Sequence, residues 1–129
     1  MIFLNVEEVI DYHTEIINEF GGSHGIRDLG LLISAVEMPK AQMFGEELHV
    51  TIFDKAAAYL FHIICNHPFI DGNKRSGTVA ALTFLASNNV ALKFNPKELE
   101  ELVVQVEEGK IKKEGIAKFF EASFQGIEP

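Results

Sequence analysis

Apolar residues recur at helical spacing along most of the chain and predict a mainly helical fold. The first such stretch starts at Val6, after Asn5, which has the spacing of a capping box with Glu8, and it ends at the Gly-Gly pair of residues 21–22. A second, short helix is expected after Asp28, because aspartate is a common N-cap, and it must stop before Pro39.

The middle of the chain predicts two longer helices separated by polar residues. Residues 40–50 show no clear period, so a loop or a small hairpin is expected there. A third helix follows, with apolar residues on one face from Ile52 to Ile63. Residues 79–86 are apolar nearly all round, which predicts a central helix buried on every side.

The last third predicts two further helices. Asn95, Pro96 and Glu98 combine an N-cap, a proline at the first helical position and a capping-box glutamate. The period of two residues that marks strands is weak and confined to residues 90–94. The final helix is expected to carry Ile116, Phe119, Phe120 and Phe124.

These patterns together predict an all-α protein. A chain of 129 residues with 47% hydrophobic content supports one core and is short for two. We therefore expect residues 1–129 to form a single domain, a compact bundle of about six helices with a short flap or hairpin near residues 40–50. His13 is expected at the edge of the core. The single Cys65 excludes an internal disulfide and is expected to be buried.

Charge and hydropathy narrow the functional classes. The formal net charge is -8, with 11 lysines and arginines against 19 acids, so direct binding to nucleic acid is not expected. No stretch reaches the roughly 18 apolar residues of a membrane helix. The first residues lack a basic region and include two acids, so no secretory signal is expected. A cytoplasmic protein without a membrane partner is the resulting expectation.

The chemistry is concentrated in the segment that opens the predicted central helix. Residues 67–75 read His-Pro-Phe-Ile-Asp-Gly-Asn-Lys-Arg. A helix N-terminus offers unpaired backbone N–H groups and the positive end of the helix dipole, which together attract anions. Arg75 can bind phosphate oxygens bidentately, and Lys74 adds a mobile point charge. Asp71 supplies one oxygen ligand of the kind Mg²⁺ accepts, and His67 is the strong general-base candidate nearby.

Three other interpretations of this segment are not favoured. A polar helix cap with a surface basic pair explains isolated residues of these types, but not so many of them before an apolar helix. A Walker loop is excluded, because Thr78 and Val79 stand after Gly77 where Lys-Ser/Thr is required. The spacing of His62 and His67 also matches no zinc signature.

Residues 67–75 closely resemble the Fic/Doc family signature, His-x-Phe-x-(Asp/Glu)-(Gly/Ala)-Asn-(Gly/Lys)-Arg. Residues 21–32 also look like the upstream region of the death-on-curing (Doc) toxins of that family. The resemblance implies a helical bundle in which Phe69 anchors the loop and residues 40–50 form a flap that holds the target. It implies the following roles: His67 as general base, Asp71 as Mg²⁺ ligand, the backbone of Gly72, Asn73 and Lys74 as phosphate cradle, and Arg75 as ligand of the nucleotide's phosphates.

The resemblance leaves the reaction open. Adenylylating Fic enzymes carry glycine where this chain has Lys74 and a second arginine where it has Thr78, and both departures are shared with Doc toxins. We therefore expect a Doc-like toxin of a toxin–antitoxin system that transfers the terminal phosphate of ATP to a threonine of elongation factor Tu and arrests translation. The alternatives are a Fic-type adenylyltransferase and a catalytically silent binding module.

Restraint of such a toxin is expected to come from a partner. Self-restraining Fic proteins carry Ser/Thr-x-x-x-Glu-Gly/Asn. Two glutamates in this chain are followed by glycine, Glu108 and Glu114, and the residues four positions before them are Val104 and Lys110, neither of which is serine or threonine. We therefore expect no built-in inhibitor, and an antitoxin segment that covers the active-site groove.

Overall fold

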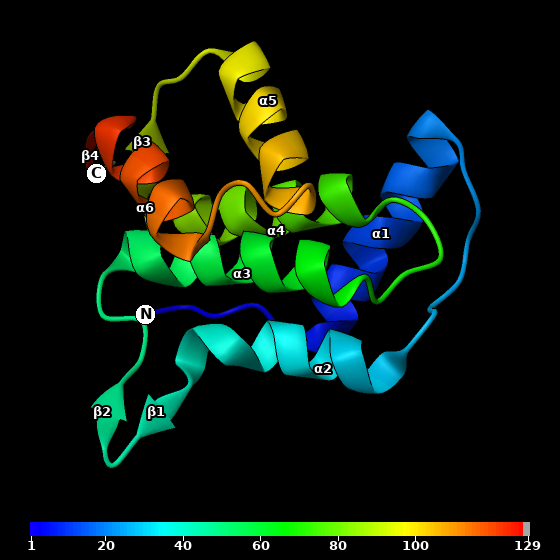
Figure 1. The fold of residues 1–129 in the computed structure, drawn as a ribbon, viewed down its shortest axis with the longest axis horizontal. Helices are drawn as coiled ribbons and strands as arrows, with labels where there is room; N and C mark the ends of the chain where they lie inside the picture. The colour runs from blue at the N-terminus through cyan, green and yellow to red at the C-terminus, as the bar shows by residue number, and fades with distance from the viewer. Residues whose placement is uncertain (128–129) are drawn as a thin grey trace.

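The computed structural model describes residues 1–127, which form a bundle of helices with two small pairs of strands (Figure 1). The helices are α1 (Val6–Phe20), α2 (Leu29–Glu37), α3 (Ile52–Asn66), α4 (Asn73–Ser87), α5 (Pro96–Glu107) and α6 (Lys113–Ala122), and a 3-10 turn, η1 (Met38–Lys40), follows α2. The strands are β1 (Gln42–Met43) with β2 (Glu46–Glu47) and β3 (Val90–Leu92) with β4 (Phe124–Ile127), and both pairs are antiparallel. The predicted all-α class is confirmed.

The helix starts follow the predicted caps. Asn5 and Glu8 form the predicted capping box, and Asp28 accepts a hydrogen bond from the first turn of α2. Each such cap stabilises a helix by about 1 kcal/mol. The predicted capping box of α5 is not observed, because Asn95 Oδ1 accepts from the N–H of Lys97 and not from that of Glu98.

Helices α3 and α4 form the centre of the bundle. Helix α3 packs against α4, α6 and α2, and α1 packs against α4 (Figure 1). The prediction that residues 79–86 are buried on every side is wrong at four positions, because Val79, Leu82 and Thr83 are half-buried and Ala86 is exposed. The side of α4 that carries Val79 faces a hollow between α1 and α5, which leaves this apolar surface partly open.

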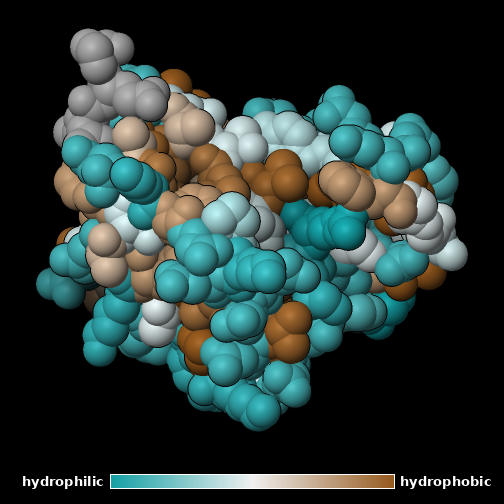
Figure 2. Space-filling model, turned by 90° about the horizontal axis from the view of Figure 1, so that it is seen from above, coloured by the Kyte–Doolittle hydropathy of each residue, from teal (hydrophilic) through white to brown (hydrophobic). Residues whose placement is uncertain are grey.

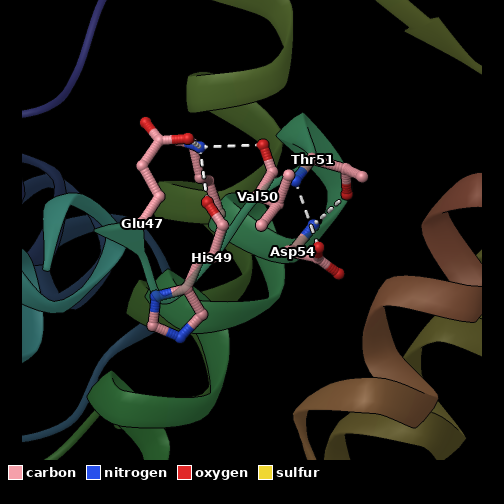
Figure 3. A network of polar contacts seen from close by, with 6 residues as sticks. Glu47, His49, Val50, Thr51 and Asp54 are labelled. Carbon is pink, nitrogen blue, oxygen red and sulfur yellow. Dashed lines mark hydrogen bonds and ion pairs between the residues drawn. The ribbon is translucent and has the colours of Figure 1, made fainter. Parts of the chain in front are cut away.

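The expected hairpin near residues 40–50 is present, as β1 and β2. Lys55 of α3, only 3% exposed, binds the segment that joins the hairpin to α3. Its Nζ donates to the carbonyl oxygens of His49 and Val50 and forms an ion pair with Glu47 at 3.4 Å (Figure 3). The hairpin lies at the opposite end of α3 from the loop that joins α3 to α4 (Figure 1). A target segment held there would have to run along a helix about 22 Å long to reach His67.

Three side chains differ from their expected places. Phe124 lies beyond the end of α6, in β4, where it pairs with Leu92 of β3. Cys65 is exposed, because it sits on the outward side of the last turn of α3 beside the buried Ile63 and Ile64. His13 is buried rather than at the core's edge. None of the helices within residues 1–127 is long and apolar enough to span a membrane.

Candidate active site

The loop of residues 67–72 makes a sharp turn between α3 and α4 by means of two residues in the left-handed conformation. Gly72, with φ of 79°, stands at the N-cap of α4. His67, with φ of 49°, ends α3. The left-handed conformation costs a residue with a side chain about 1–2 kcal/mol, whereas glycine adopts it freely. The packing around the loop must therefore hold His67 in a strained position.

A buried amide closes the loop into a ring. Asn73 Oδ1 accepts from the backbone N–H of Phe69 at 3.0 Å, and its Nδ2 donates to the carbonyl of Phe69 at 2.9 Å. The ring of Phe69 is fully buried, as the resemblance implied. The side chain of Asn73 is therefore committed to the loop, and only its backbone N–H is left to bind a ligand.

His13 of α1 supports the loop from below. Its ring stacks on Phe69 with a centroid distance of 3.8 Å and an interplanar angle of 2°, and Nε2 lies 2.8 Å from the carbonyl oxygen of Asp71. Burial lowers the pKa of His13, although the hydrogen bond to Asp71 opposes the shift. A neutral imidazole that donates from Nε2 satisfies this geometry. The signal in the sequence was a histidine on the apolar face of an amphipathic helix.

The segment between α1 and α2 wraps around the outside of the loop. Ile70 N–H donates to the carbonyl of Gly25 at 3.0 Å, and the N–H groups of Arg27 and Asp28 both donate to the carbonyl of Pro68. These backbone contacts are why residues 21–28, far from the motif in sequence, form part of the site.

Arg27 also caps the end of α3. Its Nε donates to the carbonyl of His67 at 2.6 Å, and its Nη2 donates to the carbonyl of Asn66 at 2.9 Å. The last carbonyls of a helix have no partner within the helix, and a cation nearby also complements the dipole. Arg27 thus fixes the backbone from which the imidazole of His67 projects.

The carboxylate of Asp71 is exposed but firmly oriented. Oδ2 accepts from the N–H of Ser23 at 3.1 Å, and Oδ1 accepts from the N–H of Gly72 at 2.9 Å. Gly22 leaves room for this arrangement, because a Cβ at residue 22 would lie 2.5 Å from Asp71 Oδ2. Both oxygens keep further lone pairs that can accept a cation.

The N-terminus of α4 presents free donors toward the same place. Gly72 provides no side-chain cap. Among residues 1–127, the backbone N–H groups of Asn73, Lys74 and Arg75 have no hydrogen-bond partner. Three unpaired amides at the positive end of a 15-residue helix form an anion site.

Two cations, each held by a side chain of another helix, complete the anion site at the N-terminus of α4. The guanidinium of Arg75 lies 3.9 Å from the centroid of the Phe20 ring of α1. Lys74 Nζ lies 3.0 Å from a carboxylate oxygen of Glu107 on α5. Both cations are therefore positioned by side chains from other helices.

All six predicted site residues line one cavity of about 380 Å³. They are His67, Asp71, Gly72, Asn73, Lys74 and Arg75. A volume of this order is typical of small-molecule sites. Sequence reasoning missed Phe20 and Glu107, which line the cavity from α1 and α5, as well as His13 and Arg27 behind it. Within residues 1–127 no group of three His, Cys, Asp or Glu side chains is placed to hold a metal ion by itself.

A second hollow of about 500 Å³ adjoins the first, between α1, α4 and α5. Its apolar lining residues are Ile16, Phe20, Val79, Pro96, Leu99, Val103 and Val104. Figure 2, which looks down on this side of the molecule, shows apolar surface gathered in a hollow bordered by hydrophilic residues. We call this hollow the α1–α5 groove. Lys74 and Arg75 line both the groove and the phosphate cavity.

Comparisons with known proteins agree with this arrangement. A model of the Fic/DOC family matches residues 3–85. Over 89 residues the chain is 43% identical to a protein named Toxin Doc from Mycolicibacterium smegmatis, covering 67% of this chain and 68% of that protein. Over 117 residues it is 32% identical to a protein named Protein kinase doc from Escherichia phage P1, covering 91% of each chain.

Proposed function

Because the chain belongs to the Fic/DOC family, we propose that it is a Doc-like toxin that transfers the terminal phosphate of ATP to a hydroxyl group of a protein. The observation that carries this proposal is that an imidazole, two carboxylates, three free amides and two cations line one cavity. The name of the phage P1 relative, a protein kinase that matches along 91% of both chains, supports the type of reaction.

The chain's own residues supply what phosphoryl transfer requires, which is mainly orientation and charge stabilisation. His67 accepts the proton of the target hydroxyl as its oxygen attacks the terminal phosphorus. The bond from that phosphorus to the bridging oxygen breaks, and ADP leaves with the electron pair. The amides that open α4, together with Arg75, bind the phosphate oxygens and stabilise the charge that develops on them.

A magnesium ion fits the donor set at Asp71. Mg²⁺ is commonly held by one or two carboxylates together with the phosphates of its nucleotide, so a group of three protein ligands is not required. The oriented carboxylate of Asp71 is the residue that would hold it. The ion, when bound, neutralises charge on the phosphates.

Adenylylation is the main alternative, and Lys74 is the reason to favour the kinase. A lysine side chain at the mouth of α4 takes up space that the phosphates would need in the AMP-transfer orientation. Incubating the protein with cell extract and ATP labelled at either the terminal or the innermost phosphate separates the two reactions. Label transferred from the terminal position is expected, and label retained only from the innermost phosphate would refute the kinase.

A catalytically silent binding module is the second alternative. The unusual backbone conformation of His67, held by Arg27, favours a catalytic role for the imidazole. Expression of His67→Ala in a host that the parent arrests tests this point. Growth comparable to that of an uninduced control is expected, and arrest as strong as the parent's would remove the case for catalysis.

The proposed target is a threonine of elongation factor Tu, whose modification would arrest translation in the cytoplasm. The family resemblance supports this choice. Phosphoamino acid analysis of elongation factor Tu after incubation with the protein and terminally labelled ATP tests it, and phosphothreonine is the expected product. An unlabelled elongation factor beside another labelled protein would reassign the target.

We further propose that residues 1–129 form a single Fic/DOC domain and that an antitoxin binds in its α1–α5 groove. The groove suits a segment with apolar side chains at helical spacing, because its floor is apolar and it lies between two helices. Its charged lining residues are Lys74 and Arg75 of α4 and Glu100 of α5, which favours a segment with acidic residues toward α4 and a basic residue toward α5. Val104→Asp, at a position that lines the groove and is 41% exposed, is expected to abolish binding of the antitoxin while leaving catalysis intact.

A further inference from the structure

Glu107 enters the phosphate cavity from α5, 33 residues along the chain from its partner Lys74. Its two carboxylate oxygens lie 3.0 and 3.1 Å from Lys74 Nζ. The inhibitory sequence pattern drew attention to the next residue, Glu108, and was absent there. Glu108 does not line the cavity, and its carboxylate lies 3.7 Å from Lys110.

The carboxylate of Glu107 has the same negative charge as the phosphate that the other groups at the N-terminus of α4 attract. The free amides of α4 and the two cations all favour an anion. The other carboxylate in the cavity lining, that of Asp71, is held by two backbone N–H groups. The carboxylate of Glu107 is held by the ammonium group of Lys74, one of the cations that a phosphate would approach.

We propose that Glu107 sets the affinity of the site for nucleotide by competing with a phosphate group for Lys74, an inference that rests on the proposed function. When a nucleoside triphosphate binds, the ion pair between Lys74 and Glu107 is broken or shared, and a carboxylate remains beside the phosphates. Loss of the pair and the added repulsion both weaken binding. The two side chains are 43% and 41% exposed, so solvent screens the interaction and the effect is moderate.

The test compares Glu107→Gln with Glu108→Gln by calorimetric titration of ATP in the presence of Mg²⁺, and of ADP without it. Each substitution removes one charge and keeps the size of the side chain on the same end of α5. Glu107→Gln is expected to bind ATP about three- to tenfold more tightly than the parent, and Glu108→Gln within about twofold of it. In the transfer reaction, the KM for ATP should fall by the same factor with little change in kcat.

A Lys74→Met background shows whether the effect runs through the ion pair. In that background, the gain from Glu107→Gln is expected to shrink, because the competition has been removed and only direct repulsion remains. An undiminished gain would overturn the competition for Lys74.

Two further outcomes distinguish this inference from the proposed function. Binding of ATP by the parent with equal or weaker binding by Glu107→Gln would overturn the inference alone; weaker binding would make Glu107 a helper of the nucleotide. Failure of both the parent and Glu107→Gln to bind ATP or ADP would overturn the proposed function and this inference with it.

Discussion

Gly22→Ala tests whether the position of the Asp71 carboxylate decides activity. A Cβ at residue 22 would lie 2.5 Å from Asp71 Oδ2, whereas ordinary contacts begin at 3.4 Å. The carboxylate must therefore move by about 1 Å, and such a displacement at a reacting centre can cost about 100-fold in rate. The move also breaks the hydrogen bond from Ser23 N–H, which is 3.1 Å long in the parent.

Gly21→Ala is the matched control for this substitution. Gly21 and Gly22 both have positive φ, at 87° and 109°, so alanine is strained at either position by about 1–2 kcal/mol. A Cβ at residue 21, however, meets no atom within 4 Å. The two variants should thus lose similar stability and differ in the clash with Asp71.

The assay is transfer of the labelled terminal phosphate at limiting substrate, together with urea unfolding of each variant. Gly22→Ala is expected to lose roughly 10- to 100-fold in kcat/KM relative to Gly21→Ala, at a similar free energy of unfolding. Equal activity of the two alanine variants would refute the reasoning, because it would show that the orientation of Asp71 does not limit the reaction.

Three further predictions concern stability. Burial, with Lys113 nearby, lowers the pKa of His62 to about 4 from 6.5, so the unfolded chain binds the proton more readily. The free energy of unfolding should therefore fall as the pH drops from about 6.5 to 4, by about 1–2 kcal/mol after solvent screening, and urea titrations of His62→Gln should show a flatter pH dependence. Asn73→Ala removes both hydrogen bonds to Phe69 and should lower the free energy of unfolding by about 2–4 kcal/mol in the same assay. Lys55→Met leaves the carbonyls of buried His49 and exposed Val50 without their donor and should cost about 1–3 kcal/mol, with exposure of the hairpin to limited proteolysis but no change in ATP binding.

Much of the fold could be predicted because its signals are local. The capping box at Asn5, the cap at Asp28 and the apolar faces of the helices depend on residues within a few positions of one another. The errors arose where tertiary contacts decided the outcome. Phe124 continues the helical spacing of the phenylalanines in α6, yet pairing with β3 places it in a strand. Val79 has an apolar neighbourhood in sequence but faces the α1–α5 groove.

The candidate site likewise has residues that the sequence predicts and residues that only the packing of the helices brings in. Its six predicted residues all fall within residues 67–75, so one motif places them together in the cavity. The residues that orient them come from elsewhere: His13 lies 58 positions before Asp71, Arg27 lies 40 before His67, and Glu107 lies 33 after Lys74. No local pattern marks such partners, because their roles exist only once α1, α3, α4 and α5 have packed.

The two hollows give a physical reason why a bound partner would restrain this protein. Lys74 and Arg75 line both the phosphate cavity and the α1–α5 groove, as does Phe20, over whose ring Arg75 is held. A segment in the groove therefore contacts the same cations that phosphate requires, and the two ligands cannot both make their full set of contacts. Because binding free energies are reciprocally linked, any loss of nucleotide affinity caused by the segment equals the loss of its own affinity caused by nucleotide. Restraint from outside thus requires only overlap at two side chains, without a change in the fold.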